Sequence, residues 1–371
     1  MKILHIISSS GMYGAEAVIL NLLRTLPDGP HSGALGVFCN ASKPNLELHE
    51  AALREGFESH LIACAGQVDR ATIAAIRALA ENTGADVIHA HGYKPDIYLY
   101  LGMRGRRVAL VSTCHTWYDT DRVVTLYGKI DRLVLRGFDR VVAVSEDVRQ
   151  RLLNAGVRKE KIRMVRNGID LRPFARPLPS PIQPSRELVV GLVGRLAWEK
   201  GVDLFLYAAT RVLPEFPGAK FVVYGEGADR AKLEALIGEL GIGDHASLAG
   251  RREDMPATYA SLDVMVSASR QEGLPMAILE GMATGLPLVG SAVGEVPSLV
   301  RNGQTGILVP PEDIEALTAA ILTLLRDAAE RSRLGAGARQ LIQDEFSAAR
   351  MTADYIRVYE EAIAARRGDS K

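Results

Sequence analysis

Residues 269–285 read SRQEGLPMAILEGMATG, and this stretch determines how the surrounding chain is interpreted. The residues just before it, DVMVS at 263–267, form an apolar run that predicts a buried strand. Pro275 suits the first turn of a helix, and Gly285 suits its end. The stretch is therefore a strand, a loop and a helix, with Glu272 in the loop and Glu280 inside the helix.

The start of this helix is a candidate anion site. The first backbone N–H groups of a helix have no partner inside it and carry partial positive charge. Those near Gly273, Leu274 and Met276 would face a phosphate, and the carboxylates of Glu272 and Glu280 would accept hydrogen bonds from hydroxyl groups. A phosphate flanked by hydroxyl groups on either side describes a sugar nucleotide, and the alternative interpretation is a pair of glutamates on an ordinary surface helix, where this spacing is common.

The composition describes a soluble globular enzyme. A chain of 371 residues is about right for two domains, and its 44 basic and 44 acidic residues demand neither nucleic acid nor an acidic matrix as a partner. No apolar run approaches the roughly 20 residues that span a bilayer, and the N-terminal MKILHIIS predicts a strand rather than a signal peptide. We therefore expect the cytoplasm as the compartment. The three cysteines, Cys39, Cys64 and Cys114, are widely spaced, so we expect buried thiols rather than disulfides or a zinc site.

Apolar strands alternate with helical stretches through the first half of the chain. The expected strands are residues 2–8, 34–39, 59–62, 86–90, 109–114 and 140–144. Such alternation predicts a parallel sheet covered on both faces, with ligands at the carboxyl ends of the strands. His115 directly follows one strand, so we predict that its imidazole projects into the ligand crevice. His89 and His91 also end a strand and are weaker candidates.

A glycine loop, G-M-Y-G-A-E at 11–16, links the first strand to an amphipathic helix that reaches about Leu26. This loop is not the G-x-G-x-x-G of dinucleotide-binding proteins, and no acidic residue ends a second strand some twenty residues later. We therefore do not expect a nicotinamide cofactor. A tight turn that binds nothing is the alternative interpretation of this loop.

A proline-rich linker separates the two halves, because residues 171–184 contain five prolines and a second series of strands and helices begins at Leu188. That series opens with VVGLVGRLAWEKG at 189–201, in which Arg195 follows a strand and Lys200 precedes a helix. Arginine can grip two oxygens and lysine supplies a compact charge. These two cations are predicted to hold a pyrophosphate without a metal ion.

The pattern E-G-L-P-x-x-x-x-E-G-M-A-x-G-x-P from Glu272 to Pro287 resembles the donor-site motif of glycosyltransferase family 4. Three further motifs match the same family: G-R-x-x-x-x-K-G from Gly194, G-A-E from Gly14, and N-G-I-D from Asn167. The resemblance thus covers nearly the whole chain. Members of the family are retaining enzymes with the GT-B fold.

The resemblance implies an α/β fold of two Rossmann-like domains that face each other across a cleft. The expected N-terminal, acceptor-side domain is 1–170, the linker is 171–187, and the nucleotide-sugar domain is 188–350. The C-terminal helix, from about 348 to 365, is expected to cross back to the first domain, so residues 351–371 are assigned to that domain.

Roles of individual residues also follow from the resemblance. The first glutamate of the family motif contacts the donor sugar and the second contacts the ribose, which assigns these roles to Glu272 and Glu280. A histidine at the place of His115 helps to bind the donor sugar. The predicted catalytic residues are His115, Arg195, Lys200 and Glu272, and the predicted donor-binding residues are Gly14, Arg252, Gly273, Leu274, Pro275 and Glu280.

The implied enzyme is a metal-independent transferase of the hexosyltransferase type, which needs a nucleoside diphosphate sugar and no other cofactor. Asp119 and Asp121 form the D-x-D that binds metal in the other major glycosyltransferase fold, but no further oxygen ligands lie nearby, and we expect Asp121 to cap a helix. The alternatives are a sugar-nucleotide epimerase of similar shape and a non-catalytic protein that binds sugar nucleotides.

The neutral total charge hides two oppositely charged halves, because residues 1–180 contain 24 Lys and Arg against 18 Asp and Glu. Basic residues interleaved with aromatic ones can hold a protein on an anionic membrane. We therefore hypothesise a cytoplasmic enzyme, peripheral at the inner membrane, that glycosylates a lipid-linked glycan in surface polysaccharide synthesis; the alternative is a solvated face with buried tyrosines. The residues concerned are Arg104, Arg106, Arg107, Arg132, Arg136, Arg140, Tyr93, Tyr98, Tyr100, Trp117 and Tyr118.

Overall fold

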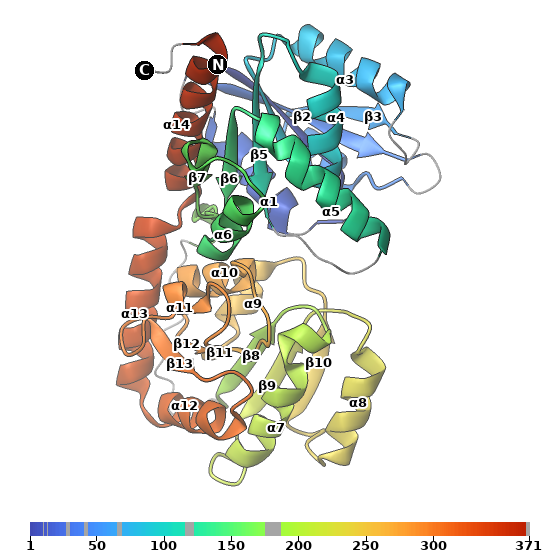
Figure 1. Cartoon of the computed structure of the whole chain (residues 1–371). Coiled ribbons are helices and arrows are strands. Elements are labelled where there is room, and N and C mark those ends of the chain that lie inside the picture. The colour runs from blue at the N-terminus through green and yellow to red at the C-terminus, as the bar shows by residue number, and fades with distance from the viewer. Residues whose placement is uncertain are drawn as a thin grey trace. The chain divides into compact units, whose positions relative to one another are not determined.

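The chain divides into two compact units (Figure 1). The computed structural model describes residues 1–9, 11–12, 14–26, 30–40, 44–64, 69–115, 122–174 and 187–368. The first unit contains Met1–Gly168 together with Ala348–Lys371, and the second contains Ile169–Ser347. Most of the predicted linker, residues 175–186, lies outside the described residues, and a short 3₁₀ helix, η4 (Arg172–Phe174), precedes it.

The described strands of the first unit form one parallel sheet in the order β3-β2-β1-β4-β5-β6-β7. Their bounds are β1 Lys2–Ile7, β2 Ser32–Cys39, β3 Glu58–Ala63, β4 Val87–His91, β5 Ala109–Cys114, β6 Arg140–Ala143 and β7 Ile162–Met164. Cys64 and Cys114 are buried, as predicted. The expectation for Cys39 was wrong, because it is the last residue of β2 and is partly exposed at the end of the sheet.

Helices cover both faces of this sheet, as a parallel sheet requires (Figure 1). Their bounds are α1 Gly14–Thr25, α2 Glu47–Arg54, α3 Arg70–Thr83, α4 Tyr93–Met103, α5 Arg122–Val134, α6 Glu146–Asn154 and α14 Ala348–Arg367, with the 3₁₀ helices η2 Leu135–Gly137 and η3 Lys159–Lys161. The C-terminal α14 packs on α1, β4, β5 and β6. The prediction that the last helix returns to the first domain is confirmed.

The second unit repeats the same architecture with its described strands in the order β10-β9-β8-β11-β12-β13, all parallel. The strands are β8 Val189–Val193, β9 Lys220–Tyr224, β10 Ala246–Gly250, β11 Val264–Ser267, β12 Leu288–Ser291 and β13 Gly306–Val309. The helices are η5 Trp198–Lys200, α7 Val202–Val212, α8 Arg230–Glu239, α9 Met255–Ala260, α10 Met276–Thr284, α11 Val296–Leu299, α12 Ile314–Arg326 and α13 Ala328–Glu345.

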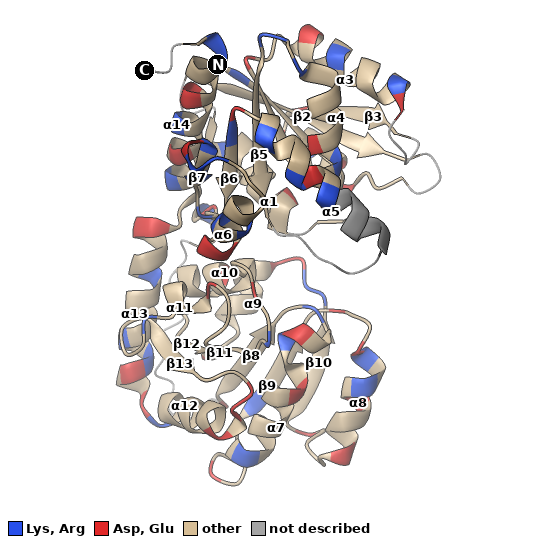
Figure 2. Cartoon of the chain, viewed as in Figure 1, with Lys and Arg blue, Asp and Glu red and all other residues tan. Residues whose placement is uncertain are grey.

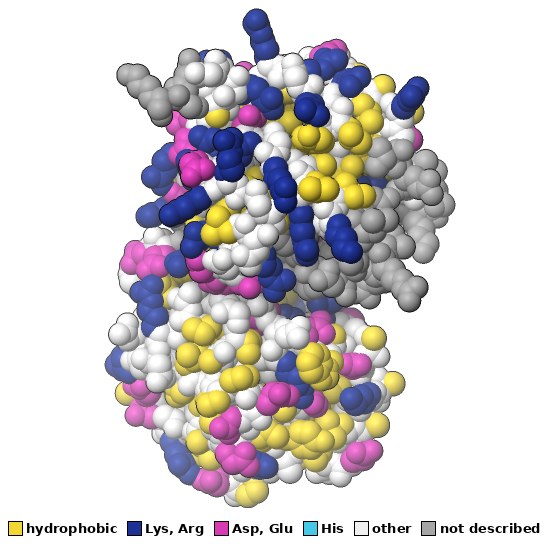
Figure 3. All heavy atoms as spheres, in the orientation of Figure 1, with side chains coloured by type: hydrophobic (Ala, Val, Ile, Leu, Met, Phe, Trp, Pro, Cys, Tyr) yellow, Lys and Arg dark blue, Asp and Glu magenta, His cyan; other side chains and the backbone are white. Residues whose placement is uncertain are grey.

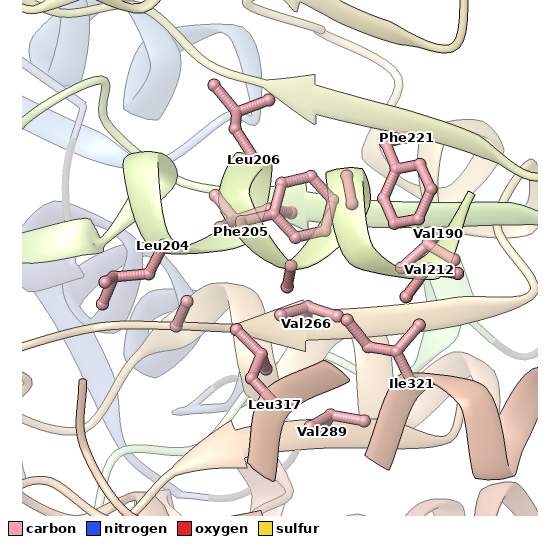
Figure 4. Packing of buried hydrophobic residues seen from close by; sticks show 14 of the residues in the cluster. Val190, Leu204, Phe205, Leu206, Val212, Phe221, Val266, Val289, Leu317 and Ile321 are labelled. Carbon is pink, nitrogen blue, oxygen red and sulfur yellow. The ribbon is translucent and has the colours of Figure 1, made fainter. Parts of the chain in front are cut away.

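The core of the second unit lies between its sheet and the helices α7 and α12. Figure 4 shows Phe205 and Val212 of α7 beside Phe221, Val266 and Val289 of the strands, with Leu317 and Ile321 of the neighbouring helix α12 facing the same cluster. The rings of Phe205 and Phe221 meet at an interplanar angle of 62° with centroids 5.6 Å apart, a favourable tilted arrangement. These apolar strands are buried on both faces and hold the loops at their carboxyl ends in place.

The strand order reverses between β8 and β11. In an open parallel sheet, the loops at such a reversal diverge toward opposite faces and leave a crevice where ligands bind. The loop after β8 carries Arg195 and Lys200, and the loop after β11 carries Glu272. The topology therefore places the predicted diphosphate and sugar residues on neighbouring strands.

Gly201 lets these two loops approach each other closely. It has φ of 62°, and a Cβ on it would lie 2.0 Å from the carbonyl oxygen of Ala268, just after β11. Only glycine avoids both the left-handed strain and the overlap with a backbone atom. The position of Lys200, the preceding residue, therefore depends on a glycine at 201.

We predict that Gly201→Ala lowers the free energy of unfolding by about 1–3 kcal/mol, the usual cost of a strained left-handed residue. Denaturant unfolding measures this change. The matched control is Gly243→Ala, because a Cβ there would have no neighbour within 4 Å and the backbone has no positive φ. Equal stability of the two variants would contradict the close approach.

Candidate functional site

Two loops at the carboxyl ends of β8 and β11 bring Lys200 and Glu272 into contact. The Nζ of Lys200 donates a hydrogen bond of 2.6 Å to Oε1 of Glu272, and Oγ of Ser269 donates one of 2.7 Å to the same oxygen. The side chains of Lys200 and Glu272 are only 20% and 8% exposed. Because the pair is largely withdrawn from water, removing one partner leaves a poorly solvated charge. We call Lys200, Ser269 and Glu272 the β8/β11 corner.

Helix α10 begins next to this corner, as predicted. Pro275 is its N-cap, and Gly285 ends it in the left-handed conformation with φ of 89°. The residues between Glu272 and the helix, Gly273 and Leu274, form the short loop predicted for them. The N–H of Ile278 donates to the carbonyl oxygen of Pro275 over 3.1 Å, and the N–H groups of Met276 and Ala277 precede this bond, so they add partial positive charge at the helix start that follows Glu272.

The side chain of Arg270 locks the two loops together. It makes two hydrogen bonds of 2.8 Å to the carboxylate of Asp203 and one of 2.8 Å to Oε1 of Glu312. It also donates to the carbonyl oxygen of Trp198 over 2.9 Å and lies over that indole ring, 5.2 Å from its centroid. Burial opposes ionisation of Asp203, but hydrogen bonds and charge from Arg270 outweigh it and hold the pKa of Asp203 below its usual value. The loops that carry Lys200 and Glu272 are thus fixed by a charged brace.

Arg195 lies close to the corner in sequence but takes a different environment. Its side chain is 59% exposed and donates from Nη2 to Oε1 of Glu199 over 2.7 Å. An exposed ion pair of this kind is worth little, so Glu199 can release the guanidinium to an anionic ligand at small cost. The stem of Lys200 passes close to Gly194, the residue before Arg195, where a Cβ would lie 3.6 Å from it.

The second predicted glutamate, Glu280, lies in the second turn of α10. Its Oε2 accepts a hydrogen bond of 2.9 Å from the hydroxyl of Tyr259 in α9. Burial raises the pKa of Glu280, and the hydrogen bond from Tyr259 partly offsets this. Its position therefore suits a carboxylate that can accept further hydrogen bonds from hydroxyl groups besides the one from Tyr259.

Arg252 lies beyond the end of β10, where its guanidinium stacks over the ring of Tyr224 at 5.5 Å from the centroid. The hydroxyl of Tyr224, at the end of β9, is 3.2 Å from Oγ of Ser261. Arg252 is exposed and Tyr224 is half-buried. A planar cation on an aromatic ring at the strand ends forms one wall against which a flat ligand can pack.

In the first unit, Gly14 begins α1 and His115 directly follows β5. His115 is half-buried, and burial lowers the pKa of its imidazole to about 4. His91 lies beside it, with 3.5 Å between Nδ1 of His91 and Nε2 of His115. His89 is fully buried and hydrogen-bonded through both ring nitrogens, so it is a structural residue rather than a crevice residue.

Several predicted features lie outside the described residues. They include the D-x-D pair, Asp119 and Asp121, and the aromatic residues Trp117 and Tyr118. The interpretation of Asp121 as a helix cap therefore stays a prediction.

Sequence reasoning missed three residues that support the site. Ser269 orients Glu272, Arg270 braces the two loops, and Tyr259 holds Glu280. Ser269 and Arg270 directly precede the glutamate motif and follow a buried strand, which is a usable signal for polar residues at a ligand crevice. Tyr259 lies in a separate short helix, α9, and its partner is known only from the fold.

Comparison with known proteins finds two family models that match the chain in succession. Residues 12–172 match Glycosyltransferase Family 4, and residues 179–341 match Glycosyl transferases group 1. Each model covers one of the two series of strands and helices.

Individual relatives match over most of their length. N-acetyl-alpha-D-glucosaminyl L-malate synthase of Bacillus anthracis is 24% identical over 339 residues, which is 87% of this chain and 86% of that protein. Glycogen synthase of Mycobacterium tuberculosis is 30% identical over 308 residues, or 76% of this chain and 70% of that protein. The crystal structure of HepE from Anabaena in complex with UDP superposes with a TM-score of 0.84 at 20% identity, covering 97% of this chain and 100% of that one. The predicted fold of two Rossmann-like domains is confirmed.

The buried environment of Glu280 gives a pH-dependent prediction. Because burial raises its pKa in the folded protein, the folded state holds this proton more tightly than the unfolded state. Stability therefore falls as the pH rises from the unfolded value of 4.5 through the folded pKa. Glu280→Gln removes that loss, so the stability of the variant relative to the unsubstituted protein should increase over this range.

Thermal unfolding of both proteins from pH 4 to pH 8 measures the difference. Glu315→Gln is the control, because that exposed carboxylate shows an ion pair to Arg211 at the surface instead of burial. A stability difference between Glu280→Gln and the unsubstituted protein that does not change with pH would contradict the raised pKa.

Proposed function

The chain belongs to glycosyltransferase family 4, and we propose that it transfers a sugar from a nucleoside diphosphate sugar to an acceptor hydroxyl with retention of anomeric configuration. The observation that carries this proposal is the β8/β11 corner, in which a cation and a carboxylate meet beside a helix start. This arrangement fits a ligand that carries a phosphate next to hydroxyl groups. Sugar nucleotides have that chemistry.

The diphosphate of the donor competes with Glu272 for Lys200. When the phosphate takes over Lys200, Oε1 of Glu272 keeps its hydrogen bond from Ser269 and gains free capacity to accept from hydroxyls of the sugar. Lys200, Arg195 and the first turn of α10 then stabilise the negative charge that develops on the leaving diphosphate. Because Arg270 braces both loops, this charge stabilisation needs little rearrangement.

The nucleoside is bound by residues around the same strand ends. Glu280 accepts from the ribose hydroxyls, which add to the hydrogen bond from Tyr259 and further offset the desolvation of its carboxylate. The stacked pair of Arg252 and Tyr224 forms the wall against the base. The solved relative HepE contains UDP, which supports a nucleoside diphosphate as the ligand class for this chain. The family role of His115, a contact with the donor sugar, stays a prediction.

Retention follows from front-face attack. The acceptor oxygen forms its bond to the anomeric carbon on the face from which the diphosphate leaves, the bond to the phosphate oxygen breaks, and the acceptor proton passes to the departing phosphate. A double displacement would need a nucleophilic side chain on the opposite face of the sugar, and the sequence offers none in a clear position. Family membership supports the front-face route.

The experiment that tests the proposal incubates the protein with UDP-, GDP- and ADP-sugars and analyses the products by mass spectrometry and NMR. A new glycoside with the donor's anomeric configuration is the expected result. An epimerised donor would identify a sugar-nucleotide epimerase, and donor binding without a product would identify a binding protein. An inverted linkage would contradict the mechanism.

The acceptor is proposed to be a lipid-linked glycan that a cytoplasmic enzyme reaches at the inner membrane. The supporting surface lies on the packed helices α4 and α5, where Leu101 and Leu133 are 49% and 60% exposed. Arg104 follows Leu101 at the end of α4, and Lys129 lies one helical turn before Leu133 on α5. Figures 2 and 3 show Lys and Arg side chains beside hydrophobic ones over these helices. No helix among the described residues is both long and apolar enough to cross a membrane.

Some residues of the predicted membrane surface have structural contacts or are buried, so they do not support membrane binding. Arg136 donates to the carbonyl oxygen of Ala155, and Arg140 pairs with Glu361, so both have structural roles. Tyr98 is fully buried. Arg106 pairs with Glu81, but both side chains are exposed and such a pair is worth little, so the basic loop at 104–107 and the exposed leucines remain as the supporting surface.

We predict that Lys200→Ala and Arg195→Ala each lower turnover by on the order of 10²-fold or more, because each removes a fixed positive charge from the leaving group. Steady-state kinetics with an active donor measures this. Lys232→Ala and Arg326→Ala are the controls, since both replace exposed cations away from the strand ends of the site. Nearly normal turnover of either site variant would remove that residue from the proposed role.

Metal independence is a further prediction, because Arg195 and Lys200 occupy the role that an ion bound by D-x-D would have. Turnover should be unchanged after chelation with EDTA. If EDTA abolished turnover and Mg²⁺ or Mn²⁺ restored it, the pair Asp119 and Asp121 would become the candidate ligands.

The membrane proposal predicts that the protein sediments with liposomes containing anionic lipid and that salt weakens this binding. Each well-placed cation is worth about 1 kcal/mol at such a surface. The triple variant Arg104→Gln, Arg106→Gln and Arg107→Gln should therefore bind more weakly, whereas Arg251→Gln with Lys232→Gln in the second unit should not. If binding at low salt were the same with neutral and anionic liposomes, a soluble acceptor would be favoured.

A further inference from the structure

Several buried polar side chains lie together on one face of the sheet of the first unit, and we call them the polar seam. His5 on β1 is the register partner of His89 on β4, and His91 on β4 is the partner of Thr113 on β5. Residues two apart on a strand point to the same face, so His89 and His91 share a face with each other and with these partners. Helix α14 packs on this face with its buried Tyr355 and Tyr359. Strands of a parallel sheet are usually apolar, so buried imidazoles on them require a structural or functional explanation.

Within the seam, His89 has hydrogen-bond partners at both of its ring nitrogens. Nδ1 of His89 is 2.9 Å from the hydroxyl of Tyr359, and Nε2 of His89 is 2.7 Å from Oγ1 of Thr113. Thr113 in turn lies 2.9 Å from the hydroxyl of Tyr355. These contacts satisfy His89 and anchor α14 to the sheet.

The other histidines, His5, His91 and His115, form a row that ends at His115, just after β5. Nδ1 of His5 lies 3.1 Å from Nε2 of His91, and Nδ1 of His91 lies 3.5 Å from Nε2 of His115. Burial lowers the pKa of all three rings, to about 3 for His5 and about 4 for His115. Each ring is therefore neutral near pH 7 and carries one donor and one acceptor.

In a row of neutral imidazoles joined by hydrogen bonds, the N–H groups must all point toward one end of the row or all toward the other. If protons point from His115 toward His5, the N–H of His5 is left on Nε2, a buried atom that has no hydrogen-bond partner among the described residues. If they point from His5 toward His115, the atom Nε2 of His5 is a bare acceptor. A buried N–H without a partner is the rarer case in proteins, so the second direction is favoured. It leaves His115 with its proton on Nδ1.

We propose that His5 and His91 are positioning residues that hold His115 as a neutral imidazole with its proton on Nδ1, which makes His115 a hydrogen-bond donor to an uncharged hydroxyl group of a bound sugar. The identity of that ligand rests on the proposed function, whereas the position of the proton rests on the seam alone. In this state His115 acts neither as a cation nor as a general base through Nδ1.

The same histidines could instead hold a metal ion. Among the described residues, His5, His89 and His91 are the one group of at least three possible ligands whose ligand atoms all lie within 4.8 Å of one another. Both nitrogens of His89 already have hydroxyl partners, and the 3.1 Å between His5 and His91 is a hydrogen-bond distance. The contacts therefore favour the hydrogen-bonded row, and metal binding becomes an outcome of the test.

The direct test is NMR of the full chain with ¹⁵N-labelled histidine, in which long-range couplings show which nitrogen of each ring carries the proton. The spectrum of His115→Asn assigns the signals of His115. We expect Nδ1 of His115 to be protonated and Nε2 to be bare, and the reverse would overturn the proposal. In His91→Leu the tautomer of His115 should become mixed, whereas His91→Asn, whose amide can still donate toward Nε2, should preserve it.

Kinetics provides the second readout. The amide nitrogen of Asn lies near the place of Nδ1 and that of Gln near the place of Nε2, so His115→Asn should keep about tenfold more turnover than His115→Gln, the scale of one hydrogen bond. His60→Gln, at an exposed histidine, is the control. Greater activity of His115→Gln would overturn the donor role. A stoichiometric transition metal in the purified protein, lost in His5→Ala, would overturn the row itself.

The NMR and kinetic experiments distinguish failure of the tautomer proposal from failure of the proposed function. If the chain transferred no sugar, the NMR spectrum would still decide where the proton lies. If it transferred sugar while Nε2 of His115 carried the proton, only the inference would fail.

Discussion

The contact between Lys200 and Glu272 is the constraint around which the second unit is organised. A cation and a carboxylate can be withdrawn from water only if each stays paired, and the alternation of strands and helices brings them together from loops 72 residues apart in sequence. Arg270 fixes these loops with its bonds to Asp203 and Glu312. An anionic ligand that enters the corner exchanges one partner of Lys200 for another, so the cost of burying the charge is already met before binding.

Both units place chemistry at the carboxyl ends of parallel strands, but they do so with different groups. The second unit presents charged residues, with Lys200 and Arg195 after β8 and Glu272 after β11. The first unit presents His115, a neutral ring after β5 that a row of buried imidazoles leads to. This difference matches the proposed sugar transfer, in which the leaving group is anionic and the sugar is uncharged.

The sequence predicted those features that local signals encode. Pro275 and Gly285 marked the ends of α10, and the motif between them led to the family, because backbone preferences act at fixed positions. Helix α13 was missed, since Gly335 and Gly337 lower its helix propensity and it is held by packing against α10 and α12. Side-chain partners that meet across the fold, such as Lys200 with Glu272 or His5 with His91, leave no trace in local sequence and needed the structure.

The most direct test of the central claim, that Lys200 in this corner binds the diphosphate, is calorimetric titration with nucleoside diphosphates and the matching monophosphates. The unsubstituted protein should bind the diphosphate more tightly, and Lys200→Met should lose most of that preference while it keeps affinity for the monophosphate, because the variant retains the stem that packs near Gly194 and lacks only the charge. If Lys200→Met kept the full preference for the diphosphate, the second phosphate would be bound elsewhere, and the account of the corner as the leaving-group site would be wrong.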